Sequence, residues 1–251
     1  MHTFVTVIFF IYGLVFGSFF NVVGLRVPNG TLLAQTRSYC DTCQRTLTWK
    51  ELVPVWSFLR QSGRCRECKE KISLLYPIME LATGFLAAVT FYRYGWSGQT
   101  VLGLLLIALI IPVTVSDLAY SKIPNKLLLF FTPLFVAVRL LYPQPSLWMS
   151  LAGAGLAFIL VFVVILASNG GMGAGDLKYF TLLGFIFGPV HFLLLFFLAT
   201  LYGAIVGMIL MKLKGGDRKM TIPFGPYIGL AAMTVFYFGE ALIQWYLAFF
   251  S

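Results

Sequence analysis

The chain has 251 residues, of which 59% are hydrophobic and only 11% are charged, and its formal net charge is +9. This composition excludes an ordinary soluble enzyme, because apolar runs long enough to cross a bilayer recur along the whole sequence. The predicted fold is all-α, a polytopic membrane protein of about eight transmembrane helices with one small polar insert after the first helix.

The apolar runs predict the helices in chain order. They fall near residues 4–24, 74–92, 101–116, 127–142, 147–168, 177–187, 190–211 and 226–250. The run 177–187 is followed by Gly188-Pro189 and spans only roughly half of a bilayer core. We divide the chain into a first transmembrane helix (1–24), a cytoplasmic four-cysteine insert (25–73) and a transmembrane bundle (74–251).

The first run carries Gly13 and Gly17 at a spacing that lets two helices approach closely, and Asn21 as a polar group that needs a partner. Packing is favoured over direct chemistry for this cluster. No basic residue precedes the run and Arg26 follows it, so we expect a retained, reversed anchor rather than a cleaved signal peptide.

The insert contains all four cysteines of the chain, as Cys40-Asp41-Thr42-Cys43 and Cys65-Arg66-Glu67-Cys68. Each Cys-x-x-Cys pair can place two thiolates on one tetrahedral ion, so Cys40, Cys43, Cys65 and Cys68 predict a structural zinc site. The reducing cytoplasm disfavours disulfides, and four protein ligands leave no open coordination position for catalysis. A vestigial or facultatively occupied site is the alternative.

The distribution of Lys and Arg predicts the orientation. With the N-terminus outside, only Arg93 and Arg139 among the eighteen basic residues fall on the far side. The other sixteen lie in or beside the connections at 25–73, 117–126, 169–176 and 212–225. The positive-inside bias therefore places both termini outside and the insert in the cytoplasm. Topology explains the charge, so the expected partner is the lipid bilayer and no nucleic acid.

Two aspartates lie at the predicted cytoplasmic face. Asp117 ends one apolar run, and Asp176 begins another after the stretch Gly171-Met172-Gly173-Ala174-Gly175. An ionisable group is costly at a membrane, so each needs a function. A pair of carboxylates sharing one proton can activate water and polarise a peptide carbonyl, which predicts a membrane aspartic protease. From the aspartates alone, a transporter with an acidic pathway is equally favoured.

Neighbouring residues give candidates for substrate binding. Gly173 and Gly175 have no side chains, so their loop can bring backbone close to an extended peptide. Lys178 could bind an anionic group or a substrate carbonyl, although a topology anchor is an equal alternative. Glu80 is a further candidate carboxylate, with interhelical packing as its alternative.

The chain resembles the prepilin peptidases, also called type IV leader peptidases, nearly from end to end. Five blocks in order carry the resemblance. They are Gly17-Ser18-Phe19-Phe20-Asn21-Val22-Val23 with Arg26-Val27-Pro28; the two cysteine pairs with Ile72-Ser73 and Tyr76-Pro77-Ile78-Met79-Glu80; Asp117-Leu118 with Ile123-Pro124-Asn125; Gly173-Ala174-Gly175-Asp176-Leu177-Lys178; and Ile222-Pro223-Phe224-Gly225-Pro226.

The resemblance implies a multi-pass enzyme of the bacterial cytoplasmic (inner) membrane. Such an enzyme cuts prepilins and pseudopilins after the glycine that ends their basic leader, and here Asp117 and Asp176 would carry the hydrolysis. The resemblance also implies N-methylation of the new terminus with S-adenosylmethionine, an activity associated with the cysteine insert. A presenilin-like intramembrane protease and an acidic-pathway transporter are the alternative functions. Ala174 stands where the family commonly has a bulkier apolar residue, which bears on substrate preference.

Overall fold

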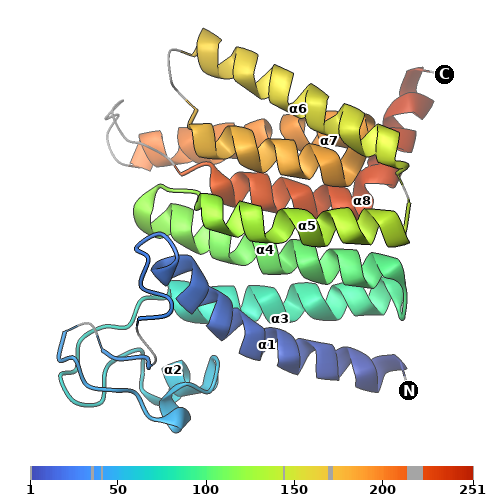
Figure 1. The fold of residues 1–251 in the computed structure, drawn as a ribbon. Helices are drawn as coiled ribbons and strands as arrows, with labels where there is room; N and C mark the ends of the chain where they lie inside the picture. Colours follow the sequence, from blue (N-terminus) through green and yellow to red (C-terminus); the bar gives the residue numbers. More distant parts are fainter. Residues whose placement is uncertain are drawn as a thin grey trace. The chain divides into compact units, whose positions relative to one another are not determined.

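The computed structural model describes residues 2–34, 37–40, 42–143, 145–168, 172–213 and 223–250 (Figure 1). Asp41, Gly171 and Ile222, quoted above in motifs, lie outside these residues. The helices are α1 (His2–Arg26), η1 (Trp49–Glu51), α2 (Trp56–Arg60), α3 (Leu75–Tyr94), α4 (Gly98–Tyr120), α5 (Asn125–Leu141), α6 (Leu147–Ala167), α7 (Ala174–Leu213) and α8 (Gly225–Phe250).

The predicted all-α membrane class is confirmed. Among the described residues there is no strand, and α1, α3, α4, α6, α7 and α8 are long and apolar enough to cross a membrane. The eight predicted runs correspond to seven long helices, because α7 contains two of the runs. Helices also extend beyond their runs: α4 continues to Tyr120, past the predicted end at residue 116, because apolarity marks the lipid-facing stretch and not the end of the backbone hydrogen-bond ladder.

The chain forms two compact units, Met1–Val115 and Ser116–Ser251, and the boundary falls within α4. The first unit holds the insert, and the second holds both aspartates. The sequence-based division at residues 24 and 73 stays a prediction.

In the first unit, α1 packs closely on α3 through small residues. A Cβ added to Gly13 would lie 2.7 Å from the Cα of Gly84, and one added to Gly17 would lie 2.8 Å from the Cα of Glu80. Asn21 is buried and donates through Nδ2 to the carbonyl oxygen of Tyr76 at 3.2 Å. The packing role expected for this cluster is confirmed.

In the second unit, α7 is a helical hairpin rather than one rod. Gly188 has a non-helical backbone (φ 73°, ψ 175°), and Pro189 follows it. The ring centroid of Phe180 lies 5.4 Å from that of Phe196, whereas a straight helix would separate these residues by about 24 Å. The chain therefore doubles back at Gly188 (Figure 1), and the predicted runs 177–187 and 190–211 form its two arms.

The first arm of α7 is held between α5 and α6. A Cβ added to Gly184 would lie 2.5 Å from the carbonyl oxygen of Gly153 in α6 and 2.6 Å from the Cβ of Ala157. The buried side chain of Arg139 in α5 donates a hydrogen bond to the carbonyl oxygen of Ile186, near the end of the arm. A cation there stabilises the carbonyl end of a helix. The arm is roughly 20 Å long, shorter than a bilayer core of about 30 Å.

Candidate active site and metal centre

The insert is built from two similar loops that are offset by 25 residues in sequence. The backbone N–H of Cys40 donates to the carbonyl of Arg45 at 2.9 Å, and that of Cys65 donates to Glu70 at 2.8 Å. The same offset relates the two β-bridges, Tyr39–Thr46 and Arg64–Lys71, and the two residues with positive φ, Gln44 (56°) and Lys69 (60°). Each cysteine pair therefore lies on a hydrogen-bonded knuckle of the same backbone shape.

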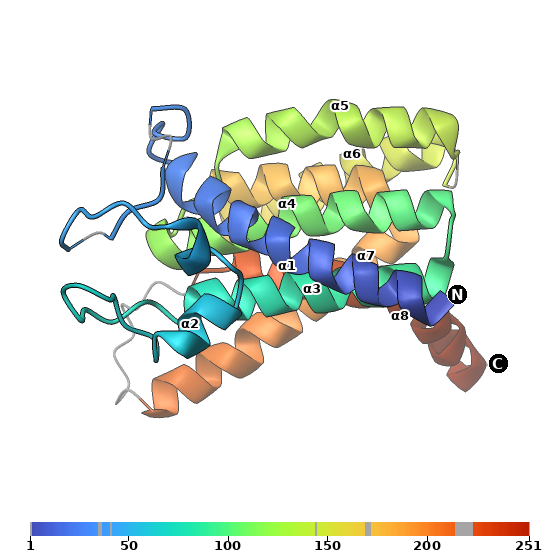
Figure 2. The same cartoon turned by 90° about the horizontal axis from the view of Figure 1, so that it is seen from below.

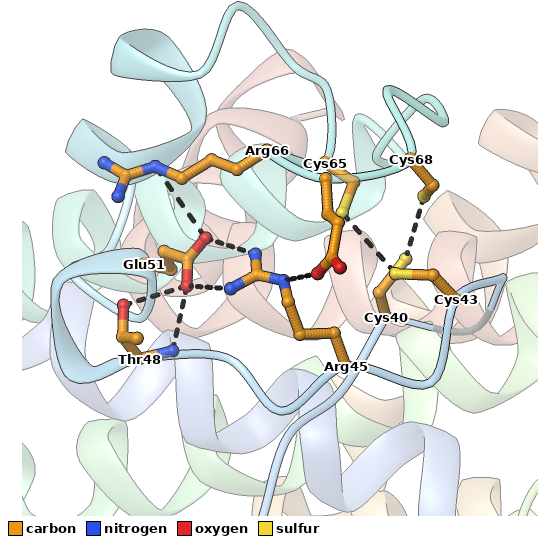
Figure 3. Close-up of polar contacts among 9 residues, drawn as sticks. Cys40, Cys43, Arg45, Thr48, Glu51, Cys65, Arg66 and Cys68 are labelled. Atoms are coloured by element: carbon orange, nitrogen blue, oxygen red, sulfur yellow. Dashed lines mark hydrogen bonds and ion pairs between the residues drawn. The ribbon is translucent and has the colours of Figure 1, made fainter.

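The four sulfur atoms meet between these knuckles (Figure 3). All lie within 4.8 Å of one another, with Cys40 Sγ 3.7 Å from Cys68 Sγ and Cys43 Sγ 4.0 Å from Cys65 Sγ. The cysteines are not joined as disulfides. A tetrahedral ion with metal–sulfur bonds of about 2.3 Å requires sulfur atoms about 3.8 Å apart. The predicted convergence of the four cysteines is confirmed, and together they could hold a metal ion.

The knuckle backbone also favours the thiolate form that metal binding requires. The N–H groups of Cys68 and Glu67 lower the pKa of Cys65 to about 6. The N–H groups of Cys43 and Thr42 likewise lower the pKa of Cys40. The thiolate form is thus favoured at one cysteine of each knuckle, Cys40 and Cys65.

A buried carboxylate, Glu51, joins the two knuckles (Figure 3). Arg45 donates to both of its oxygens, at 2.6 and 3.1 Å, and the N–H and hydroxyl of Thr48 donate at 2.9 and 2.8 Å. From the second knuckle, Arg66 Nε lies 3.8 Å from Glu51, and Glu67 lies 3.1 Å from Arg45. Arg45 and Thr48 hold the pKa of Glu51 at about 2. Sequence reasoning gave Glu51 no role, because only its contacts distinguish it from other charged residues.

Glu80, predicted as a substrate-binding residue, lies in the first unit and is buried. Its Oε2 accepts a hydrogen bond from the backbone N–H of Val55 at 2.8 Å, and Ser18 of α1 also hydrogen-bonds to it. Val55 has φ 60°, an unfavourable value for a β-branched residue, so the carboxylate holds a strained turn of the insert. Glu80 thereby connects α1, α3 and the insert; its substrate role stays a prediction.

Asp117 lies in the last turn of α4 and is 5% exposed. Its Oδ2 accepts a hydrogen bond from the N–H of Gly225, the first residue of α8, at 2.7 Å. A Cβ added to Gly225 would lie 2.8 Å from that oxygen. The glycine therefore allows the start of α8 to approach the carboxylate. The sequence pointed to Gly225 only through the Pro223-Phe224-Gly225-Pro226 block, without a role.

Asp176 lies in the first turn of α7 and is half-buried. Its Oδ2 accepts the N–H of Gly173 at 2.9 Å, which satisfies a backbone donor at the helix start. A Cβ added to Gly175 would lie 3.1 Å from the Cβ of Ile123, so this glycine permits close contact with the α4–α5 connection. Asp176 is near enough to Asp117 for their charges to interact. Both aspartates therefore lie at the same end of the second unit; their catalytic role stays a prediction.

Two further polar groups surround this end of the unit. Lys178 is exposed, and its Nζ donates to Asn125 Oδ1 at the start of α5 at 3.1 Å. Tyr179 is fully buried, and its hydroxyl has no hydrogen-bond partner among the described residues. This end of the unit therefore presents one carboxylate from α4 and, from α7, a second carboxylate, an exposed cation and a buried phenol.

Comparisons with known proteins match both units of the chain. Residues 11–94 match the Bacterial Peptidase A24 N-terminal domain, and residues 104–208 match the Type IV leader peptidase family. The chain is 36% identical over 240 residues to the prepilin leader peptidase/N-methyltransferase of Bacillus subtilis (strain 168), covering 96% of this chain and 97% of that protein.

Relatives with the same name from Xanthomonas campestris pv. campestris and Aeromonas salmonicida are each 30% identical. The matches cover 94% and 95% of this chain and 92% of each relative. No solved structure matches the chain. A relative of this similarity over nearly its whole length settles the relationship, so the chain belongs to the prepilin leader peptidase family.

Proposed function

We propose that this protein is a membrane aspartic endopeptidase that removes the basic leader from type IV prepilins and pseudopilins, cutting after a glycine at the cytoplasmic face. The observation that carries the proposal is that Asp117 and Asp176 lie at the same end of the second unit, near enough for their charges to interact. Family membership supports the substrate class, since the relatives are named prepilin leader peptidases.

The two carboxylates have different surroundings, which suits them to one shared proton. Asp117 is buried and held by the N–H of Gly225, and Asp176 is half-buried and held by the N–H of Gly173. Close carboxylates avoid carrying two negative charges at once, so one is protonated while the other is ionised.

In the proposed reaction, the ionised carboxylate takes a proton from a water molecule while the water oxygen bonds to the scissile carbonyl carbon. The protonated carboxyl gives its proton to the carbonyl oxygen. The C–N bond of the resulting tetrahedral intermediate then breaks as the proton taken from water passes to the leaving amine. At the same time one hydroxyl of the intermediate returns a proton to the carboxylate that had protonated the carbonyl oxygen, and the carbonyl re-forms as a carboxylic acid. The pair ends with one proton, ready for another cycle.

The surroundings suit a prepilin in two respects. Gly173 is exposed and lacks a side chain, so an extended peptide can approach the backbone beside Asp176; at Gly175, Ile123 lies next to the position that a side chain would take. Lys178 is exposed within two residues of Asp176 and can bind a substrate carbonyl oxygen. A prepilin has a polar leader in the cytoplasm and an apolar helix in the bilayer, so its scissile bond lies at the interface where these residues are proposed to be.

The metal assigned to the cysteine centre is zinc, because four thiolates at these separations fit its tetrahedral preference. Such a closed site is structural and cross-links the two knuckles. N-methylation of the new terminus is proposed for the same insert and Glu80, from family membership; S-adenosylmethionine would supply the methyl group. Elemental analysis of the purified protein tests the assignment of zinc.

The proposal is tested by incubating the purified protein with a prepilin and weighing the products. We expect cleavage after the leader glycine, and a methyl group on the new terminus when S-adenosylmethionine is present. Asp117→Asn and Asp176→Asn should each abolish cleavage, since one amide cannot exchange the shared proton, while the folded yield in detergent stays unchanged. Cleavage inside the apolar helix would indicate a presenilin-like protease, and ion flux without a peptide product would indicate a transporter.

A further inference from the structure

The insert exposes a cluster of large apolar side chains outside the predicted membrane spans. Trp49, Trp56 and Leu59 are 73%, 63% and 65% exposed, and Leu52 and Val53 between them are exposed as well. We call these five residues the tryptophan patch. A concentrated apolar surface of this kind marks an interaction, because water does not favour it.

The backbone of the insert holds the patch outward. Glu51, within the patch sequence, points inward and is buried against Arg45 and Thr48. Val55 is fixed to Glu80 of α3 by a 2.8 Å hydrogen bond. The Glu51 carboxylate and the Val55 N–H thus face the protein, whereas Trp49 and Trp56 are exposed. A segment that folded to be covered by its own insert would show the reverse pattern.

Charge around the patch indicates an anionic occupant. Lys50 and Arg60 flank it and are exposed, and Lys50 Nζ lies 5.4 Å from the ring centroid of Trp49. Residues 25–73 contain nine Lys and Arg residues against four Asp and Glu residues. Tryptophan combined with basic side chains is typical of segments that lie in the headgroup region of a membrane.

The position of the patch favours the same occupant. The insert leaves α1 at Arg26 and re-enters the membrane helices at Leu75, so both of its ends are tied to spanning segments. Figures 1 and 2 both place α2, which carries Trp56 and Leu59, beside the ends of α1 and α3 from which the insert emerges. This is the level at which lipid headgroups surround the helices.

We propose that the tryptophan patch lies in the headgroup region of the anionic membrane leaflet and anchors the cysteine insert to the bilayer. The two aromatic rings and Leu59 enter the interface, and Lys50 and Arg60 bind lipid phosphates. The anchor holds the four-cysteine centre at a fixed depth beside the helices. It depends on neither aspartate, so it stands or falls separately from the proposed peptidase activity.

The test uses the full chain in vesicles of phosphatidylcholine and phosphatidylglycerol. All five tryptophans are exposed, so Trp96, Trp148 and Trp245 can be changed to Phe together with either Trp49 or Trp56, leaving one fluorophore. We expect lipids brominated near the carbonyl end of the acyl chain to remove about half of the emission, as for an interfacial ring. Lipids brominated near the methyl end should quench it less, and aqueous iodide should have little effect.

Charge variants make the test specific. The double variant Lys50→Glu/Arg60→Glu should lose bromine quenching and gain iodide quenching in anionic vesicles. Arg37→Glu, the same change elsewhere in the insert, should not. Quenching by iodide alone would mean that the patch faces water, and quenching by neither reagent would mean that protein covers it; either result overturns the proposal.

A second measurement needs no substitution. Photoactivatable phospholipids are added to vesicles containing the wild-type protein, and the cross-linked peptides are identified by mass spectrometry. Labelling within residues 49–60 supports the anchor. Labelling confined to the long helices, with none in this segment, contradicts it.

Discussion

At the scale of single residues, the contact between Gly225 and Asp117 shows how a missing side chain shapes the candidate active site. The N–H of Gly225 reaches the carboxylate at 2.7 Å, and a Cβ at this position would lie 2.8 Å from the same oxygen, so a larger residue would force Asp117 or α8 to shift. A backbone donor fixed in this way orients the carboxylate without adding a titratable neighbour.

We expect Gly225→Ala to reduce leader cleavage about 100-fold, because its methyl group would displace Asp117 by a fraction of a bond length or more. The measurement is kcat for prepilin cleavage, with yield after size-exclusion chromatography as the check on folding. Gly155→Ala is the matched control, since a Cβ at Gly155 meets nothing within 4 Å. Equal activities for the two variants would contradict the role given to Gly225.

A second residue-scale prediction concerns Glu51 and pH. Its pKa of about 2 lies below the usual 4.5, so Glu51 stabilises the insert fully above about pH 4.5, and this contribution is lost as the pH falls toward 2. Glu51→Gln should remove about 1–2 kcal/mol at neutral pH, the value of a charge-assisted hydrogen bond.

The measurement is the protection of backbone amides 45–51 against hydrogen exchange, corrected for intrinsic rates, at pH 7 and pH 3. Wild-type protection should fall more between these values than that of Glu51→Gln. Glu70→Gln is the control, because the Glu70 carboxylate is exposed and, in the part of the chain that the structure describes, accepts from the N–H of the adjacent Lys71. If Glu51→Gln and the wild type lose protection in parallel, the ion pair does not stabilise the insert.

Site residues could be predicted from the sequence where the type and spacing of the residue alone indicate its chemistry. Cys40, Cys43, Cys65 and Cys68 were predicted to converge because thiolates at Cys-x-x-Cys spacing suit one ion, and the structure brings them within 4.8 Å. Asp117 and Asp176 were predicted as functional residues because an ionisable side chain in a membrane segment is energetically costly. Gly225 and Glu51 received no role, since their importance comes from contacts that exist only after folding.

At the scale of elements, the α7 hairpin depends on glycines that let helices touch. Its first arm meets α6 at Gly153 and Gly184, where added Cβ atoms would collide with opposite backbone. The break itself could be predicted, because Gly188-Pro189 interrupts the apolar pattern and proline cannot continue the hydrogen-bond ladder. The sharp reversal could not, because it requires φ 73° at Gly188 together with packing against α6.

We expect Gly153→Ala to destabilise the second unit by at least about 1–3 kcal/mol, because overpacking at a helix crossing forces backbone apart. Gly155→Ala, two residues along the same helix, should be neutral or slightly stabilising, since alanine favours the helix. Thermal unfolding in detergent, followed by circular dichroism, compares the two variants. Similar melting temperatures would show that close packing at Gly153 does not stabilise the hairpin.

At the scale of the whole molecule, the distribution of basic residues and the proposed substrate predict the same orientation in the membrane. The first unit carries the insert with nine basic residues, and the second carries both aspartates. Positive-inside bias assigns the basic connections to the cytoplasm, where a prepilin leader is also found. The helical class could be predicted from hydropathy alone; the division into two units within α4 could not, because no change in composition marks Val115.

The four native cysteines serve as labelling sites for a test of this orientation, because all of them lie in the insert. After chelation, a membrane-impermeant maleimide should leave the protein unlabelled in intact spheroplasts and label it in inverted membrane vesicles. A variant with the four cysteines changed to serine and Ser97→Cys added in the α3–α4 connection should give the opposite pattern. Labelling of the native cysteines in intact spheroplasts would reverse the proposed topology.

The turn at Gly188 also determines from which end of the second unit α8 starts. A continuous forty-residue α7 would be about 60 Å long, and the next helix would then start from the opposite end of the unit. Because the chain reverses there, α8 starts from the same end as α7, so Gly225 can reach Asp117. The positive φ at Gly188, twelve residues after Asp176, thus sets the number of crossings before α8, and the contact between Gly225 and Asp117 depends on that number.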